Sequence, residues 1–402
     1  MMPYGEFWVA LALILLIFWN LPAGIPRRAF LAAASFVYLA TLDWRSTVQL
    51  LVLAILFYFV APRPQAPLAR ARVVLTLLIF GILGYLAYFK YMPRLFAVVS
   101  PGRMVETVAI PLGISYFTFK LIHYAAERRR GTFGAHGFID FLDYLFLFPI
   151  YTAGPIERFD HFLSHRANAW EWRFAVEGLW RIIHGLIKQL ALVEYVLPAL
   201  FGDLPAISAL LGGLEQFHPW QIWRFVILTY LYAYLDFSAY TDLAIGSSRL
   251  FGIEIMENFN FPIFAQNITE FWQRWHMTLA GWCQSYIYMP LIGLTRSPYL
   301  AVYATFITIG LWHAGTWQWL AWGAYHATGV AAYVTWRRSK TRRNLIARWP
   351  RMLRVLGYPL TFLFVAAGYS LTCTHDQGTI YDSLRILVKL FGIDLPAVDS
   401  AA

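Results

Sequence analysis

The stretch SPYLAVYATFITIGLWHAGTWQWLAWGAYHATGVAAYVTW, residues 297–336, is 40 residues long and contains no Asp, Glu, Lys or Arg. At about 1.5 Å per residue, a helix of that length is about twice what one membrane crossing needs, so the stretch predicts two spans. His313-Ala314-Gly315-Thr316 is the natural joint between them. We therefore expect His313 at the end of a helix.

The composition of the whole chain also indicates a membrane protein. Of 402 residues, 59% are hydrophobic and 13% are charged, and the mean hydropathy is +0.53. An ordinary soluble domain carries about 25% charged residues. Because a soluble protein of this size cannot bury so much apolar surface, the composition excludes a disordered chain, a coiled coil, a disulfide scaffold and almost any cytosolic enzyme. It predicts an all-α, polytopic transmembrane protein.

Apolar segments of spanning length recur along the chain, with short polar joints between them. Segment 138–152 is too short for a full span and ends in Phe148-Pro149, which predicts a re-entrant element beside a cavity. No internal repeat and no soluble domain is visible, so residues 1–402 are expected to form a single membrane domain. We expect roughly 10–12 spanning or re-entrant helices around a central funnel or tunnel, with candidates at 6–21, 29–43, 46–61, 73–89, 107–126, 138–152, 174–201, 220–247, 268–292, 298–312, 315–336 and 355–373.

The net charge of +10 is concentrated near one end of the chain. Eight basic residues without an acid among them predict a positive-inside loop beside a membrane helix, and binding of anionic lipid headgroups is a compatible role. Because the flanks are membrane spans, we expect the lipid bilayer and no nucleic acid as a partner of this run. Its members are Arg337, Arg338, Lys340, Arg342, Arg343, Arg348, Arg351 and Arg354.

Ionisable side chains in apolar surroundings are functional candidates, because each is costly to bury unless it is paired. Asp236 follows a long apolar run and opens the sequence Asp236-Phe237-Ser238-Ala239-Tyr240-Thr241-Asp242. One interpretation is that Ser or Tyr hydroxyls of a neighbouring helix bind Asp236 and hold the bundle together. The other interpretation is that Asp236 belongs to a functional site inside the membrane.

A second candidate region runs from Asn258 to Pro290. Asn267 is expected to cap a helix with Glu270 at its third position, and Glu270 and Arg274 have the spacing of a salt bridge. His276 lies two residues beyond Arg274 and should face away from that pair. An amphipathic interfacial helix with an aromatic belt is the alternative to a reactive site.

The third region contains His313 and His326. Thirteen residues at about 100° each would place the two side chains on different faces of a continuous helix. We expect no metal site, because no Cys or carboxylate cluster accompanies the histidines, whereas haem ligation by two histidines stays open. The sequence has no phosphate loop and no nucleophile elbow, so histidine as a general base is the economical scheme for any catalysis.

The motifs, taken in order, resemble those of the membrane-bound O-acyltransferases, in their bacterial branch. The resemblance covers most of residues 80–335 and leaves a tail at 378–402. The blocks that carry it are Pro111–Phe119, Phe148–Arg158, Asp236–Gly246, Glu257–Asn260, Phe271–His276, Tyr286–Tyr288 and Gly310–Gly315.

This resemblance implies an enzyme that brings a thioester donor and a hydroxyl acceptor together inside the membrane. His313 matches the nearly universal histidine of the family and would be the general base, with His276 orienting the reacting groups. Asp236 matches an acidic family position that supports the cavity. Further supporting residues would be Asn258, Arg274, Trp275 and Trp312.

The resemblance also implies the partners and the location. The donor would be acetyl-CoA or a small acylated carrier protein on the cytoplasmic side, with no bound prosthetic group. An extracytoplasmic acyltransferase partner and a bacterial cytoplasmic membrane are expected. Two subgroups compete: one passes acetyl groups toward exported polysaccharide such as alginate, the other passes D-alanine toward teichoic acid. We favour acetyl transfer; a transporter or flippase is a further alternative, although it would more often show repeat symmetry.

Overall fold

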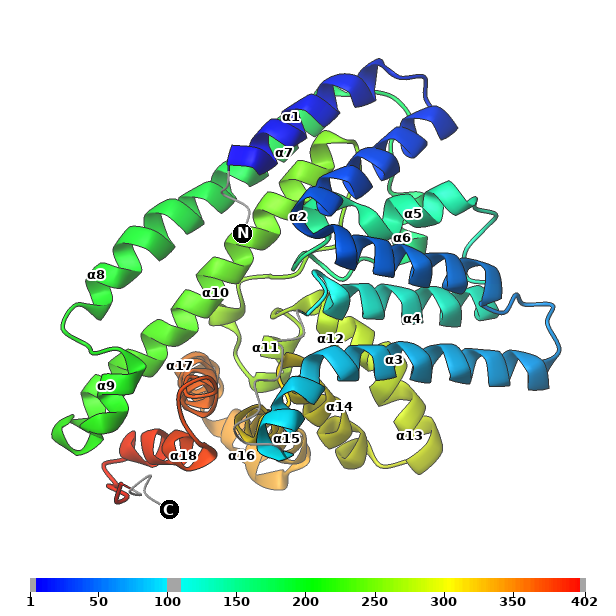
Figure 1. Ribbon diagram of the computed structural model, residues 1–402. Helices are drawn as coiled ribbons and strands as arrows, with labels where there is room; N and C mark the ends of the chain where they lie inside the picture. Colours follow the sequence, from blue (N-terminus) through cyan, green and yellow to red (C-terminus); the bar gives the residue numbers. More distant parts are fainter. Residues whose placement is uncertain (1–4, 100–109, 398–402) are drawn as a thin grey trace. The chain divides into compact units, whose positions relative to one another are not determined.

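A computed structural model describes residues 5–99 and 110–397 (Figure 1). Helices dominate both ranges, where the only β pairing is an isolated bridge between Arg166 and Ile253. The prediction of an all-α fold is confirmed. Two parts of the predicted segments, residues 107–109 and the tail from 398 onward, lie outside the described residues. Two compact units divide the chain, Met1–Ile187 with Ser238–Glu257 and Lys188–Phe237 with Asn258–Ala402.

The first unit is built from the N-terminal helices, in which α3 lies beside α4 and α2 contacts α5 (Figure 1). Segment 138–152 breaks as predicted, because its helix stops at Phe146 and a single 3-10 turn follows at Pro149. The elements are α1 Gly5–Asn20, α2 Ile25–Val60, α3 Leu68–Val99, α4 Ile114–Arg130, α5 Phe138–Phe146, η1 Phe148–Ile150, α6 Phe159–Ser164, α7 Trp172–Leu186 and the end of α10 Pro219–Leu250.

Helix α2 joins the predicted segments 29–43 and 46–61 across a kink. Asp43 has non-helical angles, φ −157° and ψ 92°. Its carboxylate accepts the N–H of Ser46 at 3.1 Å, and its carbonyl accepts the hydroxyl of Thr47 at 2.7 Å. Asp43 thus caps the second half of α2, which explains why the kink falls there.

The second unit contains a series of short helices and two long antiparallel ones. Predicted segment 174–201 is one continuous helical run, in which α7 passes through the π-helical η2 into α8. The remaining elements are η2 Ile187–Val196, α8 Leu197–Phe201, α9 Ile207–Gly212, η3 Leu214–Gln216, the start of α10, η4 Pro262–Phe264, α11 Ile268–Trp272, α12 Met277–Cys283, η5 Gln284–Tyr288, α13 Met289–Thr295, α14 Pro298–His313, α15 Trp317–Arg338, α16 Lys340–Arg348, α17 Pro350–Gly368, η6 Tyr369–Leu371 and α18 Ile380–Lys389.

Segment 268–292 differs from its prediction as one span. The chain there forms the short helices α11, α12 and α13 with a π turn between the last two. Asn267 does cap α11 as predicted, accepting the N–H of Glu270 at 2.9 Å. Helical backbone hydrogen bonds continue as far as Trp275, which donates to the carbonyl of Phe271 at 2.8 Å, and Met277 then donates to the carbonyl of Asn258 in a loop at 2.9 Å. The apolar composition of residues 268–292 predicted one long helix, whereas hydrogen bonds to the nearby loop divide the segment into short helices.

Residues 297–336, predicted as two spans, form the two helices α14 and α15 of a hairpin, with the joint after His313 as predicted. In the described part of the chain, neither helix is among those long and apolar enough to cross a bilayer. Ala314 is extended, and the hydroxyl of Thr316 accepts the N–H of Trp319 at 3.4 Å to start α15. The helices approach closely at two glycines. A Cβ at Gly310 would lie 2.3 Å from the carbonyl oxygen of Trp319, and one at Gly323 would lie 2.5 Å from that of Phe306. Small residues allow such contact between membrane helices.

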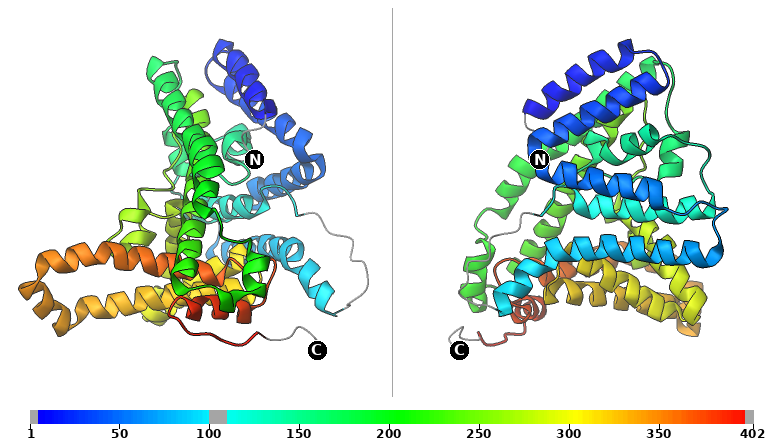
Figure 2. Two further views of the ribbon diagram at one scale, coloured as in Figure 1. Left: turned by 90° about the vertical axis from the view of Figure 1, so that its left-hand side faces the viewer. Right: turned by 45° about the vertical axis from the view of Figure 1, so that its right-hand side comes forward.

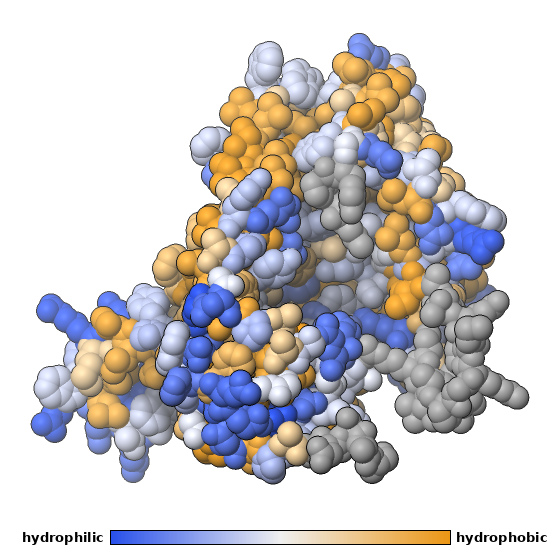
Figure 3. Space-filling view, turned by 60° about the vertical axis from the view of Figure 1, so that its left-hand side comes forward, coloured by the Kyte–Doolittle hydropathy of each residue, from blue (hydrophilic) through white to orange (hydrophobic). Residues whose placement is uncertain are grey.

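Within residues 5–99 and 110–397, four helical runs are long and apolar enough to cross a bilayer, at Ile25–Val60, Leu68–Met92, Trp172–Phe201 and Pro350–Leu371. Their apolar side chains largely face outward. On the shorter helix α1, for example, Val9, Leu13 and Leu16 are each more than half exposed. Broad apolar areas are visible on the surface in Figure 3. The chain is an integral membrane protein.

Candidate active site

His276 begins α12 in a backbone conformation that few residues adopt. Its φ of 43° and ψ of 52° lie in the left-handed region, which costs a non-glycine residue on the order of 1–3 kcal/mol. Two backbone hydrogen bonds hold this turn: Asn260 donates to the carbonyl of Arg274, and Met277 donates to the carbonyl of Asn258, each at 2.9 Å. The turn buries His276, which is 2% exposed.

The side chain of Asn258 determines which nitrogen of His276 carries the proton. Asn258 Oδ1 accepts the backbone N–H of Thr278 at 3.4 Å and its hydroxyl at 2.9 Å. His276 Nδ1 lies 2.9 Å from the same oxygen. Because an amide oxygen has only lone pairs to offer, Nδ1 must donate, which leaves Nε2 with a lone pair.

Nε2 of His276 is buried and hydrogen-bonds to none of the described residues. Burial lowers the pKa of His276 to about 3, so the ring stays neutral at physiological pH. The short helices α11 and α12 that flank it cannot cross a bilayer. The ring packs against Phe237 at 4.9 Å and Trp312 at 6.1 Å between centroids. His276 is therefore a neutral imidazole with one defined acceptor.

His313 is the last residue of α14, as predicted. Its ring stacks on Trp319 with centroids 4.2 Å apart and 14° between planes, and Trp322 meets it edge-on at 5.8 Å. Trp312, the preceding residue, lies 4.8 Å from the His313 ring. Trp312 thus contacts both His313 and His276. Unlike His276, His313 is only half-buried.

His326 lies in α15, whereas His313 ends α14, so the two are not on one continuous helix. The antiparallel hairpin brings both rings against Trp322, at 4.6 Å for His326 and 5.8 Å for His313. The prediction of different helical faces assumed continuity and does not describe this arrangement. His326 is 1% exposed, and neither ring nitrogen hydrogen-bonds to a described residue. Aromatic rings form its surroundings: Phe271, Trp272, Phe306, Tyr325 and Phe364.

Arg274 forms the predicted ion pair with Glu270, at 2.8 Å, and also donates to the carbonyl of Asn260 at 3.2 Å. Both side chains of the pair are partly exposed, 31% for Arg274 and 25% for Glu270. The next residue, Trp275, lies in an aromatic cluster. Its members are Tyr230, Tyr234, Phe259 and Phe271. Arg274 and Trp275 thus fix the turn that leads into His276.

Asp236 is half-buried on α10. No hydrogen bond or ion pair joins its carboxylate to another residue in the described part of the chain. Whether Asp236 holds the bundle together or serves the candidate site is open to test by substitution. Its role in the candidate site stays a prediction.

A model of the membrane-bound O-acyltransferase family matches residues 72–358, which is more than half of the chain. The chain belongs to the membrane-bound O-acyltransferase family. The matched range contains every residue that the sequence nominated for the site.

Bacterial relatives of this membrane-bound O-acyltransferase extend the match. A probable alginate O-acetylase of Pseudomonas aeruginosa is 32% identical over 85% of this chain and 66% of its own length. A peptidoglycan O-acetyltransferase of Helicobacter pylori is 29% identical over 87% of this chain and 71% of its own. A teichoic acid D-alanyltransferase of Bacillus subtilis is 30% identical over 64% and 67%, respectively. The chain thus spans about two-thirds of the length of these relatives.

Two family blocks meet in the first unit. The hydroxyl of Tyr240, from the block 236–246, lies 2.7 Å from that of Thr152 and accepts the N–H of Ala153 at 3.1 Å. In the same block, Asp242 forms an ion pair with Arg181 at 2.7 Å, and Arg181 also binds Glu257 at 2.5 Å. These contacts give the block a structural role in this membrane-bound O-acyltransferase.

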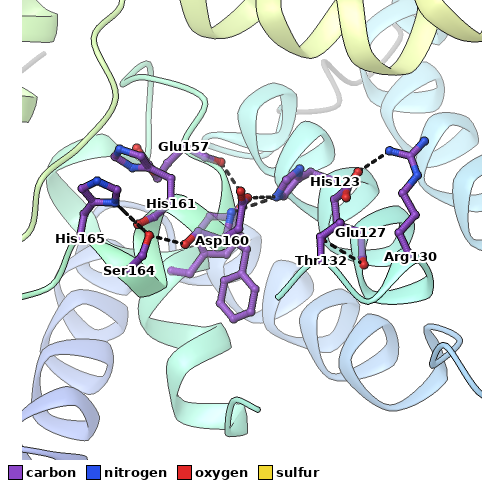
Figure 4. A network of polar contacts seen from close by, with 11 residues as sticks. His123, Glu127, Arg130, Thr132, Glu157, Asp160, His161, Ser164 and His165 are labelled. Carbon is purple, nitrogen blue, oxygen red and sulfur yellow. Dashed lines mark hydrogen bonds and ion pairs between the residues drawn. The ribbon is translucent and has the colours of Figure 1, made fainter. Parts of the chain in front are cut away.

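A polar network in the first unit was not predicted from the sequence (Figure 4). The buried carboxylate of Glu157 binds His161 at 2.6 Å and accepts the N–H of Met256 at 2.8 Å. His123 accepts the N–H of Phe159 at 3.0 Å. The residues of this network are far apart in sequence, so the only sign of it in the sequence is the presence of charged residues in the block 148–158 and in α4. The network joins α4, α6 and the chain that follows α10.

Proposed function

We propose that this chain is an O-acyltransferase of the bacterial cytoplasmic membrane. It moves an acyl group, acetyl by preference, from a cytoplasmic thioester to a hydroxyl of a cell-envelope or exported polysaccharide. The transfer is direct or passes through an extracytoplasmic partner protein. The observation that carries the proposal is the pair of imidazoles, His276 and His313, that contact one indole, Trp312.

The different burial of the two histidines supports different roles. His313 is half-buried, so a substrate can reach its ring, and we assign it as the general base. His276 is enclosed, so it acts through Trp312 and is a positioning residue. The stack of His313 on Trp319 restricts rotation of the imidazole.

The proposed reaction balances without a cofactor. A lone pair on the His313 ring takes the proton of the acceptor hydroxyl as its oxygen attacks the thioester carbonyl carbon. The tetrahedral intermediate then expels the thiolate by cleavage of the C–S bond, and the imidazolium returns the proton to sulfur. Base catalysis of this kind contributes about 10²–10⁴ in rate. No prosthetic group is required; the donor is acetyl-CoA or an acylated carrier protein.

The extent of the matches supports acetyl over D-alanyl transfer. The alginate and peptidoglycan O-acetyltransferase relatives match 85% and 87% of this chain, whereas the teichoic acid D-alanyltransferase of Bacillus subtilis matches 64%. D-alanyl transfer toward teichoic acid or a similar polymer is therefore the second candidate. A transporter or flippase is the third, and it would not transfer label from a thioester.

The proposal is tested with bacterial membrane vesicles that contain this chain together with cell-envelope polysaccharides as acyl acceptors. Vesicles receive either radiolabelled acetyl-CoA or a D-alanyl carrier protein, and label released by mild alkali is counted. We expect acetyl label to enter the polymer fraction with the wild type and to fall to background with His313→Ala. Incorporation of neither label by the wild type would count against an O-acyltransferase that uses these donors.

A further inference from the structure

We propose that the cavity between α15, α16 and α17 binds an anionic phospholipid. The phosphate lies at Arg342 and Arg354, and an acyl chain follows the apolar wall. This site goes beyond acyl transfer and does not depend on it. All of its residues belong to the second unit.

The cavity is open on one side and has a volume of about 620 Å³. In the left-hand view of Figure 2, α15 runs outward, α16 closes the far end, and α17 returns beside α15. Its apolar wall and its two arginines give it the character of an amphiphile site. The wall residues include Ile268, Ile346, Leu353, Leu360 and Phe364.

In the described part of the chain, no acidic side chain pairs with the positive charge of Arg342 or Arg354. The run 337–354 contains eight basic residues and no acid. Neither the Arg342 nor the Arg354 guanidinium forms an ion pair or hydrogen bond with any residue in the described ranges. A guanidinium binds phosphate through paired hydrogen bonds, so two of them beside one cavity favour a phosphate group.

The surroundings of the cavity favour a lipid over a soluble phosphate. Helix α17 belongs to a run long enough to span a bilayer, and Val355 and Leu360 on it are 64% and 65% exposed. Helix α16 is amphipathic: Leu345 and Ile346 are half-buried, while its basic side chains are mostly exposed. A basic amphipathic helix beside a span lies at the headgroup level. At the lower left of Figure 3, where α15, α16 and α17 lie, hydrophilic residues surround apolar ones.

The full chain, purified in a neutral detergent, is titrated with dioleoyl phosphatidylglycerol, with dioleoyl phosphatidylcholine and with glycerol phosphate. Bound lipid is counted by native mass spectrometry. We expect phosphatidylglycerol to bind most tightly. The double variant Arg342→Gln/Arg354→Gln should weaken its binding at least about tenfold, since it removes both guanidiniums that line the cavity and would pair with the phosphate.

The matched control is Arg337→Gln/Arg338→Gln, which removes two charges of the same run from exposed positions that do not line the cavity. It should keep the affinity within about twofold. Leu360→Trp, at an exposed wall position, should weaken lipid binding while both arginines remain. Equal losses in the two double variants would contradict the proposal, as would equal affinity for phosphatidylcholine. Equally tight binding of glycerol phosphate would assign the site to free phosphate.

Discussion

The hydrogen bond from Nδ1 of His276 to Oδ1 of Asn258, 2.9 Å long, leaves Nε2 as the only acceptor on that ring. Oδ1 of Asn258 also accepts two donors from Thr278. The tautomer of a buried histidine is thus determined by a residue 18 positions earlier in the chain.

Asn258→Ala should lower both stability and activity. It removes the buried oxygen that accepts hydrogen bonds from His276 and Thr278, which costs about 1–3 kcal/mol. A misplaced His276 ring would shift Trp312 against His313, and misplacement near the chemistry can cost about 10²-fold in rate. Thermal unfolding and the rate of acyl transfer at saturating donor check this. Asn260→Ala is the control, because Asn260 is exposed and bonds only through its backbone.

Asn258→Asp should add a pH dependence through His276 that is absent from the wild type. Burial holds the pKa of His276 at about 3, so Nε2 keeps its lone pair above that pH. A buried carboxylate in place of the amide would raise this pKa, because it stabilises the imidazolium. The variant should then lose activity as the pH falls from 8 toward 5, because its His276 becomes protonated. In the wild type, His276 should cause no loss of activity over this pH range. Identical pH profiles would show that His276 does not act through its neutral form.

Arg274→Ala should have a small effect. The pair with Glu270 is partly exposed on both sides, and such pairs contribute about 0–1 kcal/mol. We expect a slight fall in the unfolding temperature and activity within a few-fold of the wild type. A large loss of activity with unchanged stability would instead mean that Arg274 touches a substrate.

Gly310→Ala should displace the hairpin that carries His313. The new Cβ would lie 2.3 Å from the carbonyl oxygen of Trp319, which is backbone and cannot rotate away. We expect a loss of about 1–3 kcal/mol in stability and a matching loss of the His313–Trp319 stack. Gly293→Ala on α13 is the control, because a Cβ there meets nothing within 4 Å. Equal unfolding temperatures for the two variants would contradict the close helix contact.

The His161–Glu157 contact should make stability depend on pH. The hydrogen bond to Glu157 raises the pKa of His161 above its ordinary value of 6.5. The resulting stability is present below pH 6.5 and is lost as the pH rises through the pKa of the folded state. His161→Gln should therefore flatten the fall in unfolding temperature between pH 6 and 8.5. His184→Gln, whose ring bonds only to a backbone carbonyl, should leave that slope unchanged.

Much of the fold was predictable because its signals are local. Asn267 and Glu270 start α11 within one turn, and Glu270 and Arg274 pair across one turn. The joint at His313 follows from the residues next to it. Segment 268–292 was not predictable, since its break depends on hydrogen bonds to the loop at 258–260.

The assembly of the site depends on contacts across long sequence separations. The sequence around His276 does not indicate that Asn258 is its hydrogen-bond partner. The contact between His326 and Trp322 cannot be predicted from helical periodicity without knowing how the α14–α15 hairpin folds. The role of Trp312, which contacts both histidines, needs the packing of α14 against the start of α12. Residue types alone nominated both histidines, and only their three-dimensional arrangement shows that His313 is half-buried while His276 is enclosed.

Alkali-released esters of the cell envelope give the decisive test of acyl transfer by His313. Cells that depend on this chain are compared at matched expression with cells that carry His313→Ala, and released acetate and D-alanine are both quantified. We predict that ester-linked acetate falls to the level of cells without the chain, while D-alanine is unchanged. Unchanged levels of both esters would contradict the assignment of His313 as the general base of an envelope O-acyltransferase.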